Sequence, residues 1–439
     1  MKYYDYIIIG FGKAGKTIAK DIASRNYKVA MIEAKKEMYG GTCINVGCIP
    51  SKTIVHDGLE HVEFNKAIER KSQVVSKLNQ KNFKNLDDDA NIDVYTYHAQ
   101  FKENKVIVLM DGDQEIDTLT AEKIIINTGA KPVIPEIEGL QSSQRIYDST
   151  GIMNLAQQPD KLVIIGGGYI ALEFAAMFSN FGTKVTVIER NDDIMPKEDR
   201  EIVSEVKKAF ETKGVEFVLG ANVQYVEDKN DITIVRTENK TFEADAVLVA
   251  IGRTPNTNLG LDKTEIKLGQ RGEIVVNDKL ETDVNGVYAV GDVKGGMQFT
   301  YISLDDYRIL KDQFFGEGKR TTENRGVVPY TVFIDPPLSR VGMTLEEASK
   351  QYNAVENKVM VNQMPRHLIN NDARGMFKVV VDADSHHVLG ATLFGLQSEE
   401  LINLIKFAID QGTKYETLRD AIYTHPTMTE SFNDLFNIK

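Results

Sequence analysis

The only two cysteines among the 439 residues are Cys43 and Cys48, five positions apart. The segment around them, from Gly40 to Lys52, is rich in small residues. Two thiols this close along the chain can cycle between a dithiol and a disulfide, and the thiolate is the form that reacts. The pair therefore predicts redox chemistry, which requires a source of electrons elsewhere in the chain.

A second group that could do chemistry stands near the C-terminus. His425 is followed by Pro426, and Glu430 lies five residues further on. An imidazole whose ring is oriented by a carboxylate is suited to acid–base catalysis. We therefore predict that His425 serves as an acid–base residue with Glu430 behind it.

Composition and charge exclude several other classes of function. The net charge of −12 argues against nucleic-acid and anionic-membrane partners. No run of 18 apolar residues occurs, and the N-terminal apolar run is too short for a signal peptide, so we expect a cytoplasmic protein. The two cysteines and seven scattered histidines show no metal-ligand spacing, so we expect no metal site.

The elements before the cysteine pair form a dinucleotide-binding pattern. Ile7–Ile9 reads as a buried strand, Gly10, Gly12 and Gly15 follow it, and a helix is expected over residues 16–24. A second strand over residues 29–32 ends at Glu33. In this pattern the glycines let backbone N–H groups meet a pyrophosphate at the helix N-terminus, and the acid binds a ribose hydroxyl.

The same pattern recurs in the middle of the chain. A strand over residues 162–165 leads into Gly166, Gly168 and Ala171, and a second strand ends at Glu189. The first glycine and the acid are 23 positions apart in both copies, from 10 to 33 and from 166 to 189. This repeat predicts two dinucleotide sites on two domains. With the dithiol, two such sites indicate FAD and NAD(P)H.

The whole chain is therefore expected to be an α/β protein with two Rossmann-like domains and a C-terminal α+β domain. We expect an FAD-binding domain with the dithiol over residues 1–150, an NAD(P)-binding domain over 151–270, a return to the FAD domain over 271–322, and a dimerisation domain over 323–439. Buried strands that end in turns carry further candidate cofactor contacts, at Thr128, Gly129, Gly252, Gly291 and Asp292.

Four features together resemble one known family. They are the Gly41–Lys52 cysteine segment, the two fingerprints in their order, and the terminal His425-Pro426-Thr427…Glu430. This combination is similar to the class I flavoprotein disulfide reductases, which include lipoamide dehydrogenase, glutathione reductase and mercuric reductase. The resemblance covers the whole chain.

The resemblance implies a role for each matching residue. Cys48 would face the flavin, Cys43 would attack the substrate, and Lys52 would lie near the flavin N5, paired with Glu173. His425 would serve Cys43 from the partner subunit of a homodimer. FAD contacts are implied at Gly10, Gly12, Gly15, Glu33 and Asp292. Nicotinamide-nucleotide contacts are implied at Gly166, Gly168, Ala171 and Glu189, with Tyr169 as a gate over the flavin. The remaining cofactor contacts are expected at Gly41, Thr42, Lys52, Thr128, Gly129, Gly291, Arg190 and Gly252.

Two further expectations concern helix shape and nucleotide choice. Pro50, inside the presumed helix after Cys48, is expected to distort that helix and help the thiols meet. Glu189 should repel a 2′-phosphate and favour NADH, whereas Arg190 and Ala171 resemble NADPH-using relatives, so we expect either nucleotide to serve.

The absence of a third cysteine reduces the number of family activities that this chain could have. Mercuric reductases and high-molecular-weight thioredoxin reductases carry an extra C-terminal pair, which this chain lacks. Three segments resemble a short mercuric-reductase-like branch of this family, namely Thr53–Asp57, Phe333–Thr344 and Pro365-Arg366. This branch includes reactive-chlorine resistance flavoproteins and hypothiocyanous acid reductases. We predict NAD(P)H-dependent reduction of hypothiocyanous acid to thiocyanate. The alternatives are a dihydrolipoamide dehydrogenase or other small-disulfide reductase, and, from a different class, a flavin/dithiol redox sensor.

Overall fold

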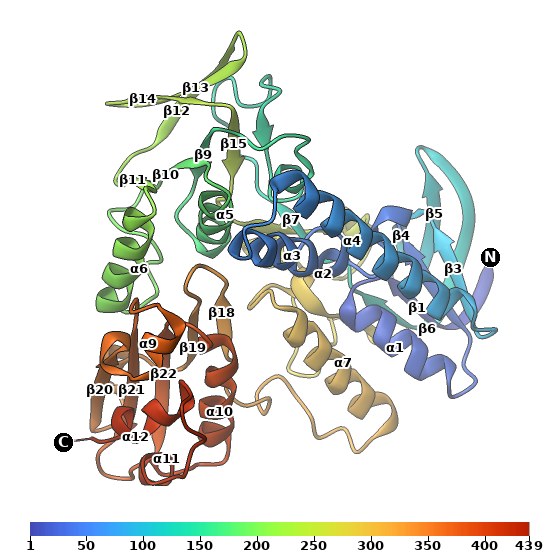
Figure 1. Ribbon diagram of the computed structural model, residues 1–439. Coiled ribbons are helices and arrows are strands. Elements are labelled where there is room, and N and C mark those ends of the chain that lie inside the picture. The colour runs from blue at the N-terminus through green and yellow to red at the C-terminus, as the bar shows by residue number, and fades with distance from the viewer. Residues whose placement is uncertain (439) are drawn as a thin grey trace.

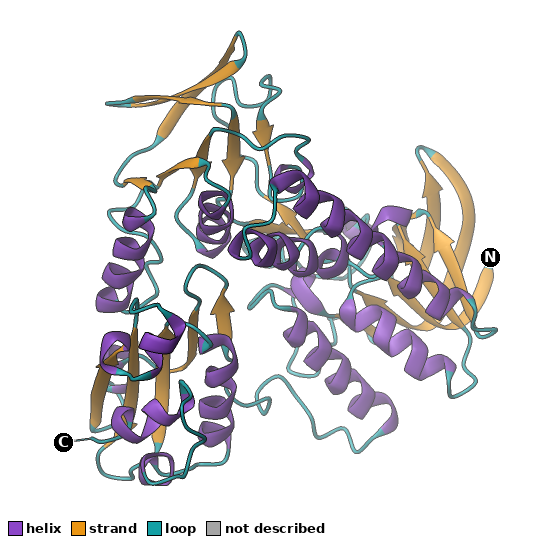
Figure 2. Ribbon diagram, in the orientation of Figure 1, coloured by secondary structure: helices purple, strands orange, loops and turns teal. Residues whose placement is uncertain are grey.

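Three main β-sheets with covering helices make up the protein, seen here in a computed structural model that describes residues 1–438 (Figures 1 and 2). The first sheet has the strand order β3-β2-β1-β6-β5-β4, and β17 pairs with β6. Its strands are β1 (Lys2–Ile9), β2 (Val29–Glu33), β3 (Ile92–Thr96), β4 (His98–Glu103), β5 (Val106–Asp111), β6 (Gln114–Ile126) and β17 (Val287–Ala289). Its helices are α1 (Lys13–Ala23), α2 (Thr42–Asn45), α3 (Cys48–Leu59), α4 (Phe64–Asp87) and α7 (Thr300–Phe315).

The register of the first sheet brings the ends of several strands to one edge. Ile9 in β1 is level with Ile32 in β2 and with Ile126 in β6, and Ala289 in β17 is also level with Ile126. All these pairings are parallel, so the residues that follow the strands meet at the same carboxyl edge. That edge is where ligands bind in sheets of this kind.

The second sheet is parallel throughout, with the order β11-β10-β9-β15-β8. Its strands are β8 (Ile146–Tyr147), β9 (Lys161–Ile165), β10 (Lys184–Ile188), β11 (Glu216–Val218) and β15 (Ala246–Val249), and its helices are α5 (Tyr169–Asn180) and α6 (Arg200–Thr212). Small antiparallel sheets accompany it. They are formed by β12 (Val223–Lys229), β13 (Ile232–Thr237) and β14 (Thr241–Ala244), and by β7 (Ala130–Pro132) with β16 (Arg253–Pro255).

At two places, residues pack in a different domain from the one that the sequence predicted for them. β8 pairs with β15 in the second sheet, although residues 146–147 were expected in the first domain. Leu259, Leu261 and Ile266 were expected in the second domain, but they are buried in the core of the first, together with Phe101. The backbone N–H of Phe101 also donates to the carbonyl of Leu259 at 2.7 Å. Buried apolar contacts therefore begin the return to the first domain before residue 270.

The C-terminal unit is one antiparallel sheet with short helices, in the order β18-β19-β22-β21-β20. Its strands are β18 (Tyr330–Val332), β19 (Leu338–Gly342), β20 (Ala354–Met360), β21 (Met376–Asp382) and β22 (Val388–Phe394). Its helices are α8 (Leu345–Ala348), α9 (Arg366–Asn370), α10 (Ser398–Asp410), α11 (Tyr415–Arg419) and α12 (Phe432–Leu435). Two Rossmann-type sheets and an α+β unit confirm the expected fold class. Across residues 1–438, no helix combines the length and the apolar character that crossing a bilayer requires.

Candidate active site

The two cysteines lie on successive helices beside the first glycine fingerprint. Cys43 is in α2, and Cys48 is the first residue of α3. Gly41, just before α2, has a φ of +81°, and a Cβ there would lie 2.6 Å from the Cα of Gly12. Only glycine allows this approach, which brings the loop that carries Cys43 onto the fingerprint turn.

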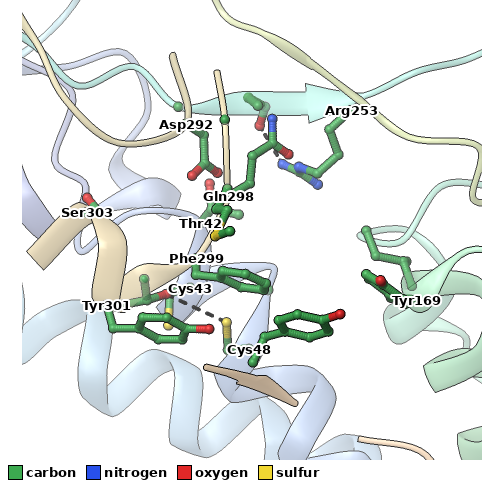
Figure 3. A pocket seen from close by; sticks show the side chains of 18 of the residues that line it. Thr42, Cys43, Cys48, Tyr169, Arg253, Asp292, Gln298, Phe299, Tyr301 and Ser303 are labelled. Atoms are coloured by element: carbon green, nitrogen blue, oxygen red, sulfur yellow. Dashed lines mark hydrogen bonds between the residues drawn. The ribbon is translucent and has the colours of Figure 1, made fainter. Parts of the chain in front are cut away.

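Both thiols are free, and Cys48 is open to a large cleft (Figure 3). The sulfur of Cys48 lies 3.7 Å from the hydroxyl of Thr300, at the start of α7. A hydrogen bond from Cys48 is the main cause that lowers the pKa of Cys43 to about 6, and the Thr300 hydroxyl and the charge of Lys16 lower it further. The same hydrogen bond, together with burial, raises the pKa of Cys48. Cys43 is therefore the thiolate at neutral pH.

Pro50 does not distort the helix, contrary to the sequence expectation. It is the third residue of α3, which runs unbroken from Cys48 to Leu59. The N–H groups of a first helical turn have no partner within the helix, so proline removes nothing there. The thiols are brought together instead by a break between α2 and α3 at Val46 and Gly47.

Lys16, which sequence reasoning missed, lies near the pair. Its ammonium donates to the carbonyl of Gly40 at 3.2 Å, just before the cysteine loop. Burial and the charge of Lys13 lower the pKa of Lys16 to about 8, while the Cys43 thiolate opposes the shift. The signal that could have found it is a lysine directly after the third fingerprint glycine, where the helix faces the loop.

The first fingerprint is built around Asn127, a second residue that the sequence reading missed. A Cβ on Gly10 would overlap the Asn127 carbonyl, and one on Gly12 would lie 2.5 Å from its Oδ1. The N–H of Gly15 donates to Oδ1 of Asn127 at 2.9 Å, and Nδ2 donates to the carbonyl of Val290 at 2.9 Å. Asn127 thus ties the fingerprint helix to the ends of β6 and β17. Its place directly after a buried strand was the available signal.

Two acids accompany this turn on the wall of the cleft. Oε2 of Glu33 accepts from the backbone N–H of Phe11 at 3.0 Å, and burial raises the pKa of Glu33. Burial likewise raises the pKa of Asp292, although the charge of Arg253 opposes it. Gly41, Thr42, Thr128 and Gly129 also line the cleft. Gly291 is not among the residues that line the cleft, and its N–H donates to the buried Asp306 at 2.8 Å.

The second fingerprint has the same local design. A Cβ on Gly166 would lie 2.6 Å from the carbonyl of Ala250, whereas one on Gly168 would meet nothing within 4 Å. Glu189 accepts from the backbone N–H of Gly167 at 2.5 Å through one oxygen and from Asn191 through the other. Ala171 is buried, whereas Arg190 is exposed. Gly252 has a φ of +131°, and its carbonyl accepts from the backbone N–H of Val133.

Lys52 and Glu173 connect the two dinucleotide-binding units. Their side chains, from α3 and α5, form an ion pair at 2.5 Å on the wall of the cleft. The second oxygen of Glu173 accepts from the backbone N–H of Phe333 at 2.9 Å, and the Lys52 ammonium lies 5.0 Å from the centre of the Phe333 ring. Tyr169, the first residue of α5, also lines the cleft, which has a volume of about 3000 Å³.

Comparison with known proteins agrees with this geometry. Residues 4–306 match the family described as pyridine nucleotide-disulphide oxidoreductase, and residues 328–436 match the dimerisation domain of the same family. The chain belongs to the pyridine nucleotide-disulphide oxidoreductases. Members of this family use FAD and NAD(P)H, so the chain is a flavoprotein oxidoreductase of the disulfide reductase type.

Individual relatives in the family cover almost all of the chain. The chain is 47% identical to the probable pyridine nucleotide-disulfide oxidoreductase RclA of Escherichia coli, over 100% of both proteins. It is 33% identical to a mercuric reductase of Bacillus cereus, over 97% of this chain and 70% of that protein. A solved Cu(II) complex of the HOCl-induced flavoprotein disulfide reductase RclA from Escherichia coli superposes with a TM-score of 0.97, at 46% identity and 99% coverage of both chains.

The first-fingerprint residues fit the FAD that this family uses. Gly10 and Gly12 lack the Cβ that would overlap Asn127, so the turn packs directly on that residue, and the partly buried carboxylate of Glu33 lies at the same edge of the sheet. The two cysteines and Lys52 line the same cleft.

His425 stands apart from this cleft, in the part of the chain that matches the family's dimerisation domain. Its Nδ1 lies 2.7 Å from Oε2 of Glu430, and 73% of its side chain is exposed. The other oxygen of Glu430 accepts from the N–H of Thr427 at 3.2 Å. Glu430 thus orients the ring as expected, but His425 is not among the residues that line the cleft with Cys43 and Cys48 in its own chain.

Proposed function

We propose that this protein uses NAD(P)H to reduce hypothiocyanous acid to thiocyanate through the Cys43–Cys48 pair. The observation that carries the proposal is the lowered pKa of Cys43, beside a cleft and in a chain that has no third cysteine. A substrate with a small electrophilic sulfur needs only one nucleophilic thiolate and one resolving thiol. The likeness to a flavoprotein disulfide reductase described as HOCl-induced supports a role in oxidant defence.

The oxidant half-reaction balances with the two thiols alone. The Cys43 thiolate attacks the sulfur of HO–S–C≡N, a Cys43–S–SCN bond forms, and hydroxide leaves with a proton as water. Cys48 then loses its proton and attacks the Cys43 sulfur, so that a disulfide forms and thiocyanate leaves with the electron pair of the broken S–S bond. Overall, the dithiol is oxidised by two electrons, and hypothiocyanous acid is reduced to thiocyanate and water.

The return half-reaction needs the two cofactors of the family. Bound FAD would carry the two electrons of NAD(P)H to the disulfide. We assign the FAD contacts to Gly10, Gly12, Gly15, Glu33 and Asp292, supported by the turn built around Asn127 and by the two acids whose pKa burial raises. Lys52, held by its ion pair with Glu173, would place a positive charge where it could stabilise the negative charge that develops during this electron transfer.

The nucleotide would bind at the second fingerprint. We assign it to Gly166, Gly168, Ala171 and Glu189, with Arg190 exposed beside them and Tyr169 on the wall of the cleft. We infer that both NADH and NADPH are accepted. The cytoplasm, where these nucleotides are held reduced, is the compartment that we propose for the reaction.

The proton of the oxidant step would come from a second subunit. We propose a homodimer in which the partner's imidazole reaches the Cys43 of this chain and protonates the leaving hydroxide. The exposure of His425, and its position in the matched dimerisation domain, support this arrangement.

A substrate panel tests the proposal. Oxidation of NADH and NADPH is followed with hypothiocyanous acid, lipoamide, glutathione disulfide and Cu(II), for the wild type and for the variants Cys43→Ser and Cys48→Ser. We expect the highest kcat/KM with hypothiocyanous acid and the loss of that turnover in both variants. A higher kcat/KM with lipoamide or glutathione disulfide would make the protein a disulfide reductase for small thiols. No sustained turnover with any acceptor would favour a redox sensor, and full activity of Cys43→Ser would refute the dithiol mechanism.

A further inference from the structure

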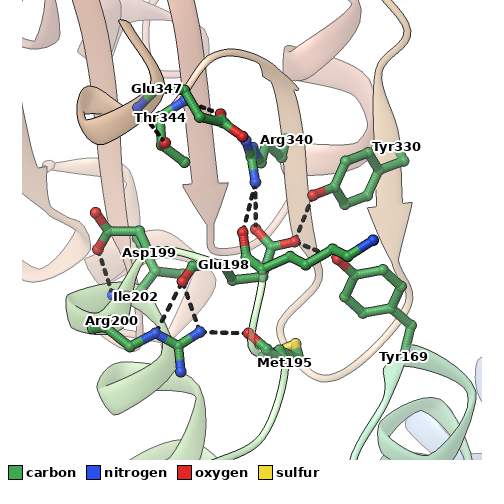
Figure 4. A network of polar contacts seen from close by, with 11 residues as sticks. Tyr169, Met195, Glu198, Asp199, Arg200, Ile202, Tyr330, Arg340, Thr344 and Glu347 are labelled. Atoms are coloured by element: carbon green, nitrogen blue, oxygen red, sulfur yellow. Dashed lines mark hydrogen bonds and ion pairs between the residues drawn. The ribbon is translucent and has the colours of Figure 1, made fainter. Parts of the chain in front are cut away.

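A buried carboxylate binds the hydroxyl of Tyr169, one of the residues that line the cleft. Glu198 lies between β10 and α6, and its side chain is fully buried (Figure 4). The Tyr169 hydroxyl donates to Oε1 of Glu198 at 2.5 Å. A hydrogen bond to an ionised carboxylate is stronger than one between neutral groups, so this contact fixes the phenol ring.

The same oxygen holds a second tyrosine from another part of the chain. The hydroxyl of Tyr330, the first residue of β18, donates to Oε1 of Glu198 at 2.5 Å. The two tyrosine rings lie 5.8 Å apart, centre to centre. One buried oxygen therefore joins α5 of the nucleotide-binding unit to a strand of the C-terminal unit.

The other oxygen of Glu198 has no hydrogen-bond partner among the described residues. Its nearest charge is Nη1 of Arg340, at 3.7 Å. Arg340 is itself fixed, because it donates to the carbonyl of Lys197 at 2.9 Å and to Glu347 at 2.7 Å. If the hydrogen bond to Tyr169 breaks, the Glu198 carboxylate therefore still has the positive charge of Arg340 nearby and still accepts from the Tyr330 hydroxyl.

A row of aromatic rings extends from this junction toward the dithiol. Tyr330 stacks on Phe299 with ring centres 6.1 Å apart, and Phe299 stacks on Tyr301 at 5.1 Å (Figure 3). Thr300, between the last two, is the residue whose hydroxyl lies 3.7 Å from the sulfur of Cys48. The position of Tyr330 is therefore linked by packing to the redox site as well as to Tyr169.

We propose that Glu198 is a positioning residue that holds Tyr169 in the closed position, and that nucleotide binding must break this hydrogen bond. The inference rests on the proposed function in one respect, namely that Tyr169 covers the route of the nicotinamide. Tyr330 competes for the same oxygen and so weakens the hold on Tyr169. Loss of the Glu198–Tyr169 bond should then make nucleotide binding easier without slowing the transfer of electrons that follows.

The test measures reduction of the bound flavin by NADH in the absence of oxygen, by stopped-flow absorbance over a range of NADH concentrations. In Tyr169→Phe, we expect the apparent Kd for NADH to fall about 3–10-fold, the size of effect that an ordinary hydrogen bond gives, because Tyr330 shares the same oxygen. In Glu198→Gln, which loses the charge but keeps an acceptor oxygen, we expect a smaller fall. The limiting rate should stay within about twofold in Glu198→Gln, because this change leaves the side chain of Tyr169 and the redox groups in place. The double variant should match Tyr169→Phe, because Glu198→Gln weakens a bond that Tyr169→Phe removes altogether.

Tyr330→Phe is the matched control, and it leaves the carboxylate in place. It should shift the apparent Kd in the opposite direction, because Glu198 would then bind Tyr169 alone. Additive effects in the double variant, or a higher apparent Kd in Tyr169→Phe, would overturn the proposal. If Glu198→Gln does not fold, the opposite shifts of the two tyrosine variants still decide the question. The measurement involves no oxidant, so its outcome is independent of whether hypothiocyanous acid is the substrate.

Discussion

The ammonium of Lys52 and the carboxylate of Glu173 meet at 2.5 Å, and this ion pair joins the helix that begins with Cys48 to the helix that follows the second glycine fingerprint. The pair is largely shielded from solvent, with 30% of the Lys52 side chain and 14% of the Glu173 side chain exposed. The ion pair thus holds the helix that carries Cys48 and the helix after the second fingerprint together on the wall of the shared cleft.

Removing the positive charge from this pair should slow reduction of the flavin. In Lys52→Met, we expect the rate of flavin reduction by NADH to fall about 10–100-fold, the equivalent of one charge-assisted hydrogen bond. Lys52→Arg should retain much of the rate. Lys66→Met serves as a control, because Lys66 forms a solvent-exposed pair with Glu63. An unchanged rate in Lys52→Met, measured by stopped-flow absorbance, would show that Lys52 only links the helices.

The pH dependence of thiol reactivity should report the environment of Cys43. Alkylation of the reduced enzyme by iodoacetamide should rise with pH around a midpoint near the Cys43 pKa of about 6, because only the thiolate reacts. Below that midpoint the thiol is protonated, and the rate should fall about tenfold per pH unit. Peptide mass spectrometry would assign the modified cysteine. A midpoint of about 8.5, the ordinary value for cysteine, would contradict the lowered pKa.

Lys16 should contribute to that midpoint. Its positive charge lowers the pKa of Cys43, so Lys16→Met should move the alkylation midpoint to higher pH. Lys20→Met, one turn further along α1, is the control, because Lys20 is exposed and pairs with Asp89. Equal midpoints in the wild type and Lys16→Met would exclude an electrostatic role for Lys16.

Asn127 should be required for retention of FAD. Asn127→Ala leaves the buried N–H of Gly15 and the carbonyl of Val290 without partners, which should lower the free energy of unfolding by about 1–3 kcal/mol. Urea unfolding, followed by release of flavin fluorescence, would measure both stability and FAD retention. Asn85→Ala, at an exposed position on α4, should change neither quantity. Normal FAD retention in Asn127→Ala would mean that the glycines alone shape the cradle.

Glu189 should discriminate between the two nucleotides. Its carboxylate already accepts hydrogen bonds from Gly167 and Asn191, so Glu189→Ala removes both a charge and the support of the loop. We expect the ratio of kcat/KM for NADPH to that for NADH to rise about tenfold, because a 2′-phosphate is no longer repelled. Glu189→Gln keeps an acceptor oxygen and should show the charge effect alone. Arg190→Gln should lower this ratio. An unchanged ratio in both Glu189 variants would show that Glu189 does not discriminate between a 2′-hydroxyl and a 2′-phosphate on the ribose.

The sequence predicted the strand–turn–helix structure around each glycine fingerprint. Each fingerprint is a short strand–turn–helix pattern whose geometry depends on neighbouring residues, so the spacing of Gly10, Gly12 and Gly15 was sufficient. The helix after the first fingerprint begins three residues earlier than expected, at Lys13, because the glycine turn itself starts the helix.

The residues that the sequence did not reveal act across long distances in the chain. Thr300 reaches Cys48 from α7, and Glu198 reaches Tyr330 from a loop before α6. No local periodicity marks such contacts, because they depend on how separate units pack. Pro50 was misjudged for a related reason. The effect of a proline depends on where its helix begins, and the two successive helices could not be told from one.

The exposed position of His425 also has a genetic consequence. If each site takes its cysteines from one chain and its imidazole from the other, two different defective alleles can complement each other. A heterodimer of a Cys43→Ser chain and a His425→Gln chain would contain one site that has lost both groups and one site that has kept both. Coexpression of two inactive polypeptides would then restore part of the activity that neither has alone.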